Sequence, residues 1–390
     1  MPDESKIHHI KILGEIGNIN PDDWNACAGD DDPFVSYAFL AALEESGSVS
    51  ADTGWMPHHL VLEDENANAL AVAPLYLKNH SYGEYVFDSG WADAFYRAGG
   101  EYYPKLQVAI PFTPVTGRRL LVRQNLAQKE QSFLQRTLLS SLIHVAKRLK
   151  ISSFHVTFPI KQEWELCGEL GLLQRTDKQF HWINDGFETF DDFLSALSSR
   201  KRKGIRKERR SVSEKNVVIR TLNGDQIEEH HWDAFYSFYQ NTSDKKWGQA
   251  YLNRDFFTLL GKNMGKKVLL IIAEFEGRFV GGALNMIGGD TLYGRHWGCL
   301  ENFKFLHFEV CYYQAMDFAI ETGLKKVEAG AQGLHKLQRG YLPTATYSAH
   351  WIANAGFRES VERYLVQETE AINEEIDYLG NHSPFKSVKH

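Results

Sequence analysis

The sequence predicts an α/β protein with two domains, each built from a mixed, largely antiparallel sheet flanked by helices. Its 390 residues suffice for two or three domains, at roughly 100 to 200 residues per domain. With 43% hydrophobic and 24% charged residues, the composition is that of an ordinary soluble globular protein. Strand-like and helix-like segments alternate along the first half, and the second half repeats this order.

In the first half, an apolar alternation over residues 58–78 is interrupted by Asn66 and Asn68, which predicts a strand, a turn and a second strand. Apolar residues at helical spacing predict an amphipathic helix over residues 129–150. Residues 80–121 are aromatic and irregular and end in a strand and a turn. The remaining expected elements are strands at 7–16, 152–158 and 173–183 and helices at 33–47 and 161–171.

The second half predicts a helix over 225–242 and three antiparallel strands within 267–298, joined by turns at Glu276-Gly277 and Gly288-Gly289. A helix over 307–323, a short strand over 325–331 and a last strand over 346–352 follow. We therefore expect an N-terminal domain over 1–190, a basic helical linker over 191–215 and a C-terminal domain over 216–390.

Charge is distributed unevenly. The segment 200–210 holds eight basic residues and one acidic residue, a net charge of +7, whereas the whole chain carries −7, which leaves −14 for the rest. Helical spacing predicts a helix here, broken or bent near Gly204. Two interpretations stay open: a solvated helix face, or an electrostatic contact with tRNA, with coenzyme A phosphates or with an anionic acceptor.

Membrane insertion and export are not indicated. No apolar run approaches the roughly 18 residues of a membrane span, and the N-terminus lacks a basic region followed by an apolar core. The four cysteines are far apart in the sequence, so we expect no disulfides and a cytoplasmic location.

The segment 325–343 is the most informative stretch. An apolar strand leads directly into a glycine-rich loop with Glu328, Gln332, His335, Lys336 and Arg339. Glycines weaken strands and buried polar groups need partners, so this run predicts a loop that binds something.

The order of helix, antiparallel strands, helix and strand resembles a GNAT acyltransferase domain. Residues 292–343 resemble the FemAB-like branch of that superfamily, in which a short strand leads into a loop that closes with a basic residue, Gly and an aromatic residue. Segments 32–49 and 79–121 add to the resemblance, which covers about residues 30 to 370, to bacterial FemAB-like proteins described as concerned with peptidoglycan biosynthesis or recognition. One departure is Leu334, where the family loop usually has an acidic residue.

The resemblance implies tandem GNAT-type domains that transfer an acyl or aminoacyl group from acyl-CoA or aminoacyl-tRNA to an amine on a small molecule or peptide. No metal is expected, since His307, Glu309 and His335 match no zinc spacing. The alternative function is a catalytically silent protein of the same fold that binds a cell-wall precursor or another anionic ligand.

Acyl transfer to an amine requires a proton acceptor, stabilisation of an oxyanion and a donor site. The expected catalytic residues are Glu328, His335, Lys336, Arg339, His307 and Glu309. The expected donor-binding residues are Arg295, His296, Trp297, Gln332, Arg202 and Arg206. The expected acceptor-binding residues are Tyr82, Asp88, Trp91, Lys105 and Arg118.

Each assignment has a structural alternative. Glu328 can pair with Arg339, and His307 and Glu309 can stabilise a helix start. His335, Lys336 and Arg339 can make ordinary loop hydrogen bonds and ion pairs. The aromatic residues of 82–103 can form interdomain core.

Overall fold

The computed structural model describes residues 9–246 and 250–386, which form two compact units. The first unit contains the described chain up to Asp177 together with Thr346–Ile372. The second contains Lys178–Ala345 and the described chain from Asn373 onward. The chain thus returns to the first unit late, whereas the sequence predicts a simple N-to-C succession of domains with residues 346–372 in the second.

The first unit holds two sets of paired strands. The small sheet has the order β1-β3-β4-β7, and the other set has the order β15-β8-β6-β5-β2, in which only β6 and β8 run parallel. The elements are β1 His9–Leu13, α1 Pro21–Ala28, α2 Tyr37–Glu45, β2 Trp55–Pro57, β3 His59–Glu63, β4 Ala69–Ala73, β5 Leu75–Lys78, α3 Ser89–Arg97, β6 Lys105–Val108, β7 Leu121–Val122, α4 Gln128–Arg148, β8 Ser153–Thr157 and α5 Lys161–Glu169.

The predicted amphipathic helix becomes α4, whose Leu134, Leu138 and Leu142 are buried at helical spacing. They join a core with Leu60, Leu106 and other residues of the strands. Burial of this face explains why α4 forms, because packing supplies most of the stability of a helix in a protein.

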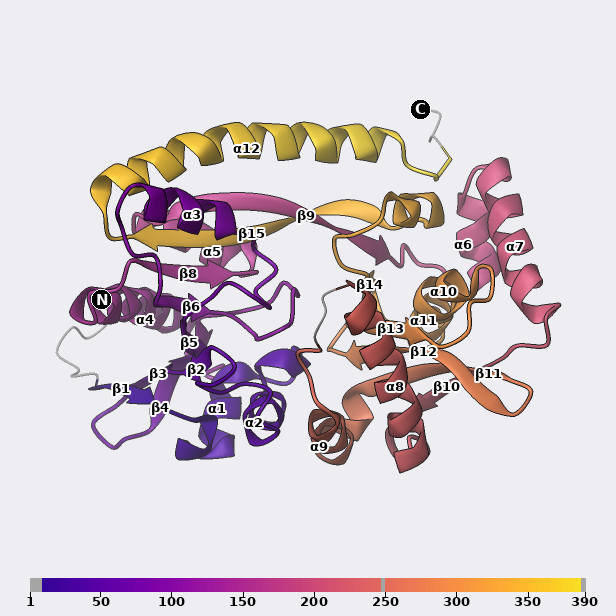
Figure 1. Ribbon diagram of the computed structural model, residues 1–390, viewed down its shortest axis with the longest axis horizontal. Helices are drawn as coiled ribbons and strands as arrows, with labels where there is room; N and C mark the ends of the chain where they lie inside the picture. The colour runs from indigo at the N-terminus through magenta and orange to yellow at the C-terminus, as the bar shows by residue number, and fades with distance from the viewer. Residues whose placement is uncertain (1–8, 247–249, 387–390) are drawn as a thin grey trace. The chain divides into compact units, whose positions relative to one another are not determined.

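The second unit is built on the strand order β10-β11-β12-β13-β14-β9, with β13 and β14 parallel. The helix formed by α10, η5 and α11 packs on these strands (Figure 1). The elements are α6 Phe190–Ala196, α7 Ser199–Ser213, β10 Val218–Asn223, α8 Glu229–Lys246, α9 Arg254–Met264, β11 Val268–Phe275, β12 Arg278–Ile287, β13 Thr291–Cys299, α10 Leu306–Phe308, the π-helical turn η5 Glu309–Tyr313, α11 Gln314–Glu321, β14 Lys326–Glu328 and the 3-10 helix η6 Leu334–Arg339.

The boundary between the two units falls within three elements, so that each contributes residues to both units: β9 Leu173–Ile183, β15 Leu342–Ile352 and α12 Ala355–Asn381. Together the elements confirm the predicted α/β class with mixed, largely antiparallel sheets. Four helices were not predicted, namely α1, α3, α9 and α12.

The basic segment forms α7, which is continuous through Gly204, so a break there is excluded. Ile205 and Val212 of α7 are buried in the core of the second unit. This helix is therefore part of a folded unit and is more than a linker.

Over residues 9–246 and 250–386, none of the helices combines the length and the apolar composition that crossing a bilayer requires.

Candidate functional site

Strands β13 and β14 run parallel and then separate. They pair only through Thr291–Tyr293 and Lys326–Glu328, while β13 continues along β12 as far as Cys299. The register between β12 and β13 shifts at Arg295, which marks a bulge. Because a bulge bends and twists its strand, β13 turns away from β14 at this point. In the described chain, no strand pairs with residues 294–299 on the side of β14.

Glu328 lies at this separation, since it is the last residue of β14 and pairs with His181 of β9. Its side chain is buried, with only 2% of the residue exposed. Lys326 Nζ lies 2.7 Å from Oε1, and His181 Nε2 lies 3.8 Å from Oε2. Within the described residues, neither carboxylate oxygen has a hydrogen bond of good geometry. A buried carboxylate with so few partners is unusual, because such groups are normally satisfied.

His181 was missed by the sequence analysis. Burial lowers its pKa below the usual value despite the attraction of Glu328, so the imidazole is neutral at pH 7. Its Nε2 has no hydrogen-bond partner in the described part of the chain. The available sequence signal was an ionisable residue within the predicted strand 173–183, at a position that alternation places on a buried face.

The cation of Arg339 is fully engaged. Its Nε and Nη2 donate to Glu208 at 3.1 and 2.7 Å, Nε also reaches Tyr313 Oη at 3.0 Å, and Nη1 donates to the His335 carbonyl oxygen at 2.7 Å. The guanidinium also lies 3.4 Å from the centre of the Phe308 ring. The alternative that Arg339 pairs with Glu328 is thereby wrong, since Glu208 on α7 is its carboxylate partner.

Lys336 is buried and donates to the carbonyl oxygens of Ala329 and Gly330, the latter at 3.1 Å. These bonds hold the chain that follows β14. Gln332 and Leu334 lie exposed on the same loop. Lys336 and Arg339 therefore shape the loop, and their predicted catalytic roles remain predictions.

An aromatic cluster joins predicted donor-binding and catalytic residues. The His307 ring centre lies 5.3 Å from Trp297 and 5.8 Å from His335. Tyr312 Oη and His335 Nε2 form a 2.9 Å hydrogen bond. Burial, followed by Arg339, lowers the pKa of His335. The tertiary structure thus brings His307, His335 and Trp297 together.

Glu309 lies in the π-helical turn. Its Oε1 accepts from Arg209 Nη2 at 3.0 Å and from Gln314 Nε2 at 2.8 Å. It does not cap the helix, because Phe305 is the N-cap residue and makes no side-chain capping bond. Glu309 mainly connects η5 to α7.

His296 is the predicted donor-binding residue that follows the bulge. Its ring packs edge-on against Tyr239, with 5.0 Å between ring centres. Burial, then the charge of Arg295, lowers its pKa to about 3. His296 is therefore neutral at pH 7.

The basic residues of α7 divide into two sets. Arg209 is committed to Glu309 and Asp317, and Arg206 pairs with exposed Asp191 at 2.8 Å. A second set is exposed at helical spacing, so it forms one stripe along the helix, and Arg202 lies partly exposed beside it. This basic stripe consists of Arg200, Lys203, Lys207 and Arg210.

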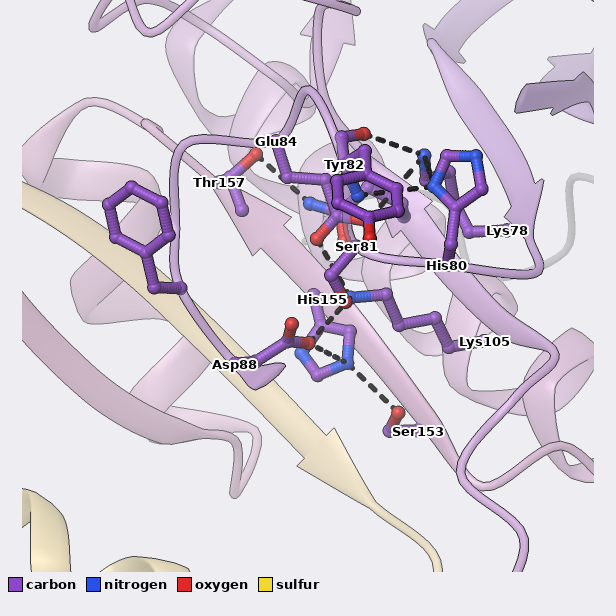
Figure 2. A network of polar contacts seen from close by, with 12 residues as sticks. Lys78, His80, Ser81, Tyr82, Glu84, Asp88, Lys105, Ser153, His155 and Thr157 are labelled. Atoms are coloured by element: carbon purple, nitrogen blue, oxygen red, sulfur yellow. Dashed lines mark hydrogen bonds and ion pairs between the residues drawn. The ribbon is translucent and has the colours of Figure 1, made fainter. Parts of the chain in front are cut away.

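The predicted acceptor-binding residues lie in the first unit, where Figure 2 shows a buried polar network. Lys105 Nζ donates to Asp88 at 2.5 Å and to Glu84 at 2.7 Å. Tyr82 contributes its carbonyl oxygen, which accepts from Lys78 Nζ at 3.1 Å.

The last two predicted acceptor-binding residues differ in position. Trp91 packs against His350 at the end of this network, with 4.8 Å between ring centres. Arg118 is engaged elsewhere, because it donates to the Cys27 and Ala28 carbonyl oxygens at the end of α1. The sequence analysis missed several members of the network, among them the ionisable residues Lys78, Glu84, His155 and His350.

Comparisons with known proteins are consistent with these observations. A family model described as FemAB-like, peptidoglycan biosynthesis/recognition, matches residues 15–387. No curated protein matches the sequence.

Solved structures resemble the chain at low identity. FemX aligns with a TM-score of 0.54 and 12% identity, over 90% of this chain and 100% of FemX. The C-terminal domain of a putative lysylphosphatidylglycerol synthetase from Agrobacterium fabrum aligns with a TM-score of 0.53 and 9% identity, over 87% of this chain and 95% of that domain. L-PGS from Bacillus licheniformis aligns with a TM-score of 0.51 and 11% identity, over 86% and 98% of the two chains. At these identities the comparison establishes the shared fold.

Proposed function

The chain belongs to the FemAB-like family, and from that premise we propose that it is an N-acyltransferase. It transfers an acyl or aminoacyl group from an activated donor, acyl-CoA or aminoacyl-tRNA, to an amine. The observation that carries this proposal is the buried, incompletely satisfied carboxylate of Glu328 at the point where β13 and β14 separate.

Glu328 is the proposed general base. The acceptor amine must lose a proton as its nitrogen attacks the donor carbonyl, and a carboxylate within hydrogen-bond reach can take that proton. Lys326 Nζ lies 2.7 Å from Oε1 of Glu328. The Nε2 atom of neutral His181 lies 3.8 Å from Oε2 and is the proposed next acceptor of that proton.

The free edge of β13 is the proposed donor side. Main-chain N–H groups of residues 294–299 that are not used by β12 can stabilise the developing oxyanion or bind the polar chain of the donor. The new bond joins the amine nitrogen to the acyl carbon, and the broken bond joins that carbon to the ester oxygen or thioester sulfur. The leaving group departs as an alcohol or a thiol after it takes up the proton that the amine has lost.

Positioning of the loop falls to Arg339 and Lys336 in this proposal. Arg339 links the loop to α7 through Glu208, and Lys336 binds the carbonyl oxygens that follow β14. Both keep Glu328 next to the separation of the strands.

Aminoacyl-tRNA is the donor that the basic stripe of α7 favours. Four exposed cations on one helix face suit a long polyanion, which gains affinity by releasing counterions. A compact acyl-CoA has fewer charges to spread along the helix.

The test is turnover with labelled donors. Purified protein is given radiolabelled acetyl-CoA or a mixture of radiolabelled aminoacyl-tRNAs, together with amines that include a peptidoglycan precursor peptide with a free amine. We expect label transfer from aminoacyl-tRNA, and a decrease of about 10²- to 10⁴-fold in Glu328→Gln, the usual contribution of a general base.

Glu321→Gln is the matched control, because Glu321 is exposed at the end of α11, and its turnover should equal that of the wild type. If label is transferred from acetyl-CoA but not from aminoacyl-tRNA, the donor is acyl-CoA and the proposed donor is wrong. Absence of transfer with every donor, in a folded protein that still binds tRNA, would favour the non-catalytic binding protein.

A further inference from the structure

The first unit contains two buried lysines that face each other across neighbouring strands. Lys78 of β5 and Lys105 of β6 are directly paired in the strand register, and both are fully buried. Like charges opposite each other destabilise a sheet, and desolvation penalises a buried ammonium. Burial accordingly lowers the pKa of Lys78 to about 6. Apolar residues at both positions would serve stability better, so a purely structural role does not account for this pair.

The carboxylates that neutralise these lysines lie on one loop, residues 79–88, rather than on the strands (Figure 2). Glu84 lies 2.7 Å from Lys105 Nζ and 3.8 Å from Lys78 Nζ, while Asp88 lies 2.5 Å from Lys105 Nζ. Lys78 also rests 3.5 Å from the centre of the Trp55 ring. The neutralising charges can therefore leave together if the loop moves.

The hydrogen bonding of the two loop carboxylates is incomplete. Glu84 Oε1 and Asp88 Oδ1 are buried and have no hydrogen-bond partner within the described residues. Glu163, a buried carboxylate of the same unit, differs, since its two oxygens accept from the main-chain N–H groups of Arg119 and Leu120 at 2.7 and 3.1 Å. Glu163 has the pattern of a permanent structural group, whereas Glu84 and Asp88 do not.

The loop also reverses the usual burial pattern. Glu84 and Asp88 point inward, while Tyr82 and Phe87 are 69% and 67% exposed. Asp88 holds the N-cap position of α3, yet its side chain caps nothing and turns to Lys105 instead. Tyr85, next to Glu84, has a φ of 59°, an unfavourable value for a tyrosine. These features suit a loop that has a second arrangement.

We propose that Lys78 and Lys105 form a binding site for the carboxylate or phosphate group of a small anionic ligand, and that Glu84 holds the place of that group when the ligand is absent. Binding displaces Glu84 and opens the loop 79–88, and Tyr82 and Phe87 become available to cover the ligand. The ligand is the acidic acceptor of the transfer reaction, and that identity alone rests on the proposed function.

The test measures binding without turnover. Inorganic phosphate and succinate are titrated by calorimetry into the wild type, Glu84→Gln and Lys78→Met, which separates a phosphate site from a carboxylate site. We expect Glu84→Gln to bind one of the probes about tenfold more tightly than the wild type, because the internal competitor has lost its charge. Lys78→Met should lose the binding. Glu65→Gln, at an exposed turn of the same unit, is the control and should match the wild type.

Hydrogen exchange measures whether the loop 79–88 opens when the probe binds. Amides of residues 79–88 should exchange faster in the presence of the bound probe, while those of β5 and β6 should not. Equal affinity in the wild type and Glu84→Gln, or binding that survives Lys78→Met, would overturn the proposal. If Glu84→Gln does not fold, the wild type and Lys78→Met are compared instead, and the proposal requires binding to the wild type that Lys78→Met loses. In that case, absence of binding to the wild type would also overturn the proposal.

The outcome is independent of the transferase assay. A protein without turnover on any donor, in which Glu84→Gln still binds an anion more tightly, would keep this site and remove the proposed function. Conversely, transfer that depends on Glu328 together with no anion binding would keep the function and remove this site.

Discussion

In both units a buried cation is engaged while carboxylate oxygens lack hydrogen-bond partners among the described residues, but the two units differ in how many oxygens of one carboxylate are left in this way. In the second unit each guanidinium nitrogen of Arg339 donates a hydrogen bond, whereas both carboxylate oxygens of Glu328 lack hydrogen bonds of good geometry to the described residues. In the first unit Lys105 donates three hydrogen bonds, and Glu84 and Asp88 each leave one oxygen without a partner in the described part of the chain. The number of charged residues therefore does not identify a functional group, whereas incomplete satisfaction of a buried group does.

The largest expected effect tests the cluster of the first unit. Lys105→Met leaves Glu84 and Asp88 buried without their main cation, and loss of one partner of a buried pair typically costs about 3–5 kcal/mol. Lys78→Met should change the free energy of unfolding by less than about 1 kcal/mol, because burial lowers the pKa of Lys78 to about 6 and its amine is therefore mostly uncharged at pH 7. Urea denaturation of both variants measures this difference. Equal destabilisation by the two variants would show that Lys78 is as structural as Lys105.

The matching test in the second unit concerns Glu208. Glu208→Ala leaves Arg339 buried without its carboxylate, and we expect a loss of about 2–3 kcal/mol in the free energy of unfolding. Asp191→Asn removes only the exposed pair with Arg206 and should cost less than about 0.5 kcal/mol. If Glu208→Ala is as mild as Asp191→Asn in the same denaturation experiment, Arg339 is not fixed by α7.

A smaller effect is a difference between the two units in how their stability depends on pH. Burial and then Arg295 lower the pKa of His296 to about 3. The neutral imidazole therefore stabilises the folded second unit fully above pH 6.5, and this stability is lost as the pH falls toward the folded pKa. The loss should reach at most about 1.4 kcal/mol per pH unit.

In the first unit, the pKa shifts of histidines and those of carboxyl groups have opposite effects on stability as the pH falls. Burial lowers the pKa of His155 to about 3 and that of His350 well below its usual value, and raises the pKa values of Glu84 and Glu163 to about 7. Between pH 4.5 and 6.5 the two histidines lose stability as the pH falls, whereas the two carboxyls gain it. Burial also lowers the pKa of His80, which adds to the histidine side of this balance. Hydrogen exchange at pH 4.5 and 6.5 should therefore show a weakened second unit and a less weakened first unit. A first unit that weakens equally would contradict the cancellation.

The smallest expected effect concerns the basic stripe of α7. The double variant Lys203→Gln/Lys207→Gln should lower the slope of log affinity for tRNA against log salt by up to about 1.8, close to 0.9 for each phosphate that the variant no longer neutralises. Its free energy of unfolding should stay within about 0.5 kcal/mol of the wild type, as for most surface changes. An unchanged slope would mean that the basic stripe is a solvated helix face that does not contact tRNA.

The sequence by itself determined the fold class, most of the elements and the family. Helical spacing in α4, alternation in β3 and β4 and the turns between β11, β12 and β13 are local patterns, and local geometry is enough to predict them. The position of Glu328 at the end of a strand was predictable for the same reason. The π-helical turn at Glu309 and the helix α12 carried no signal that the sequence analysis used.

Only the tertiary structure decided which polar groups meet. Glu208 and Arg339 are 131 positions apart, and His155 and His350 are 195 apart, yet each pair is in hydrogen-bond contact. Spacing within one segment cannot reveal such partners, because they depend on how distant strands and helices pack. The physical reason is that a charged side chain becomes structural or reactive according to its burial and its partners, and the fold as a whole sets both.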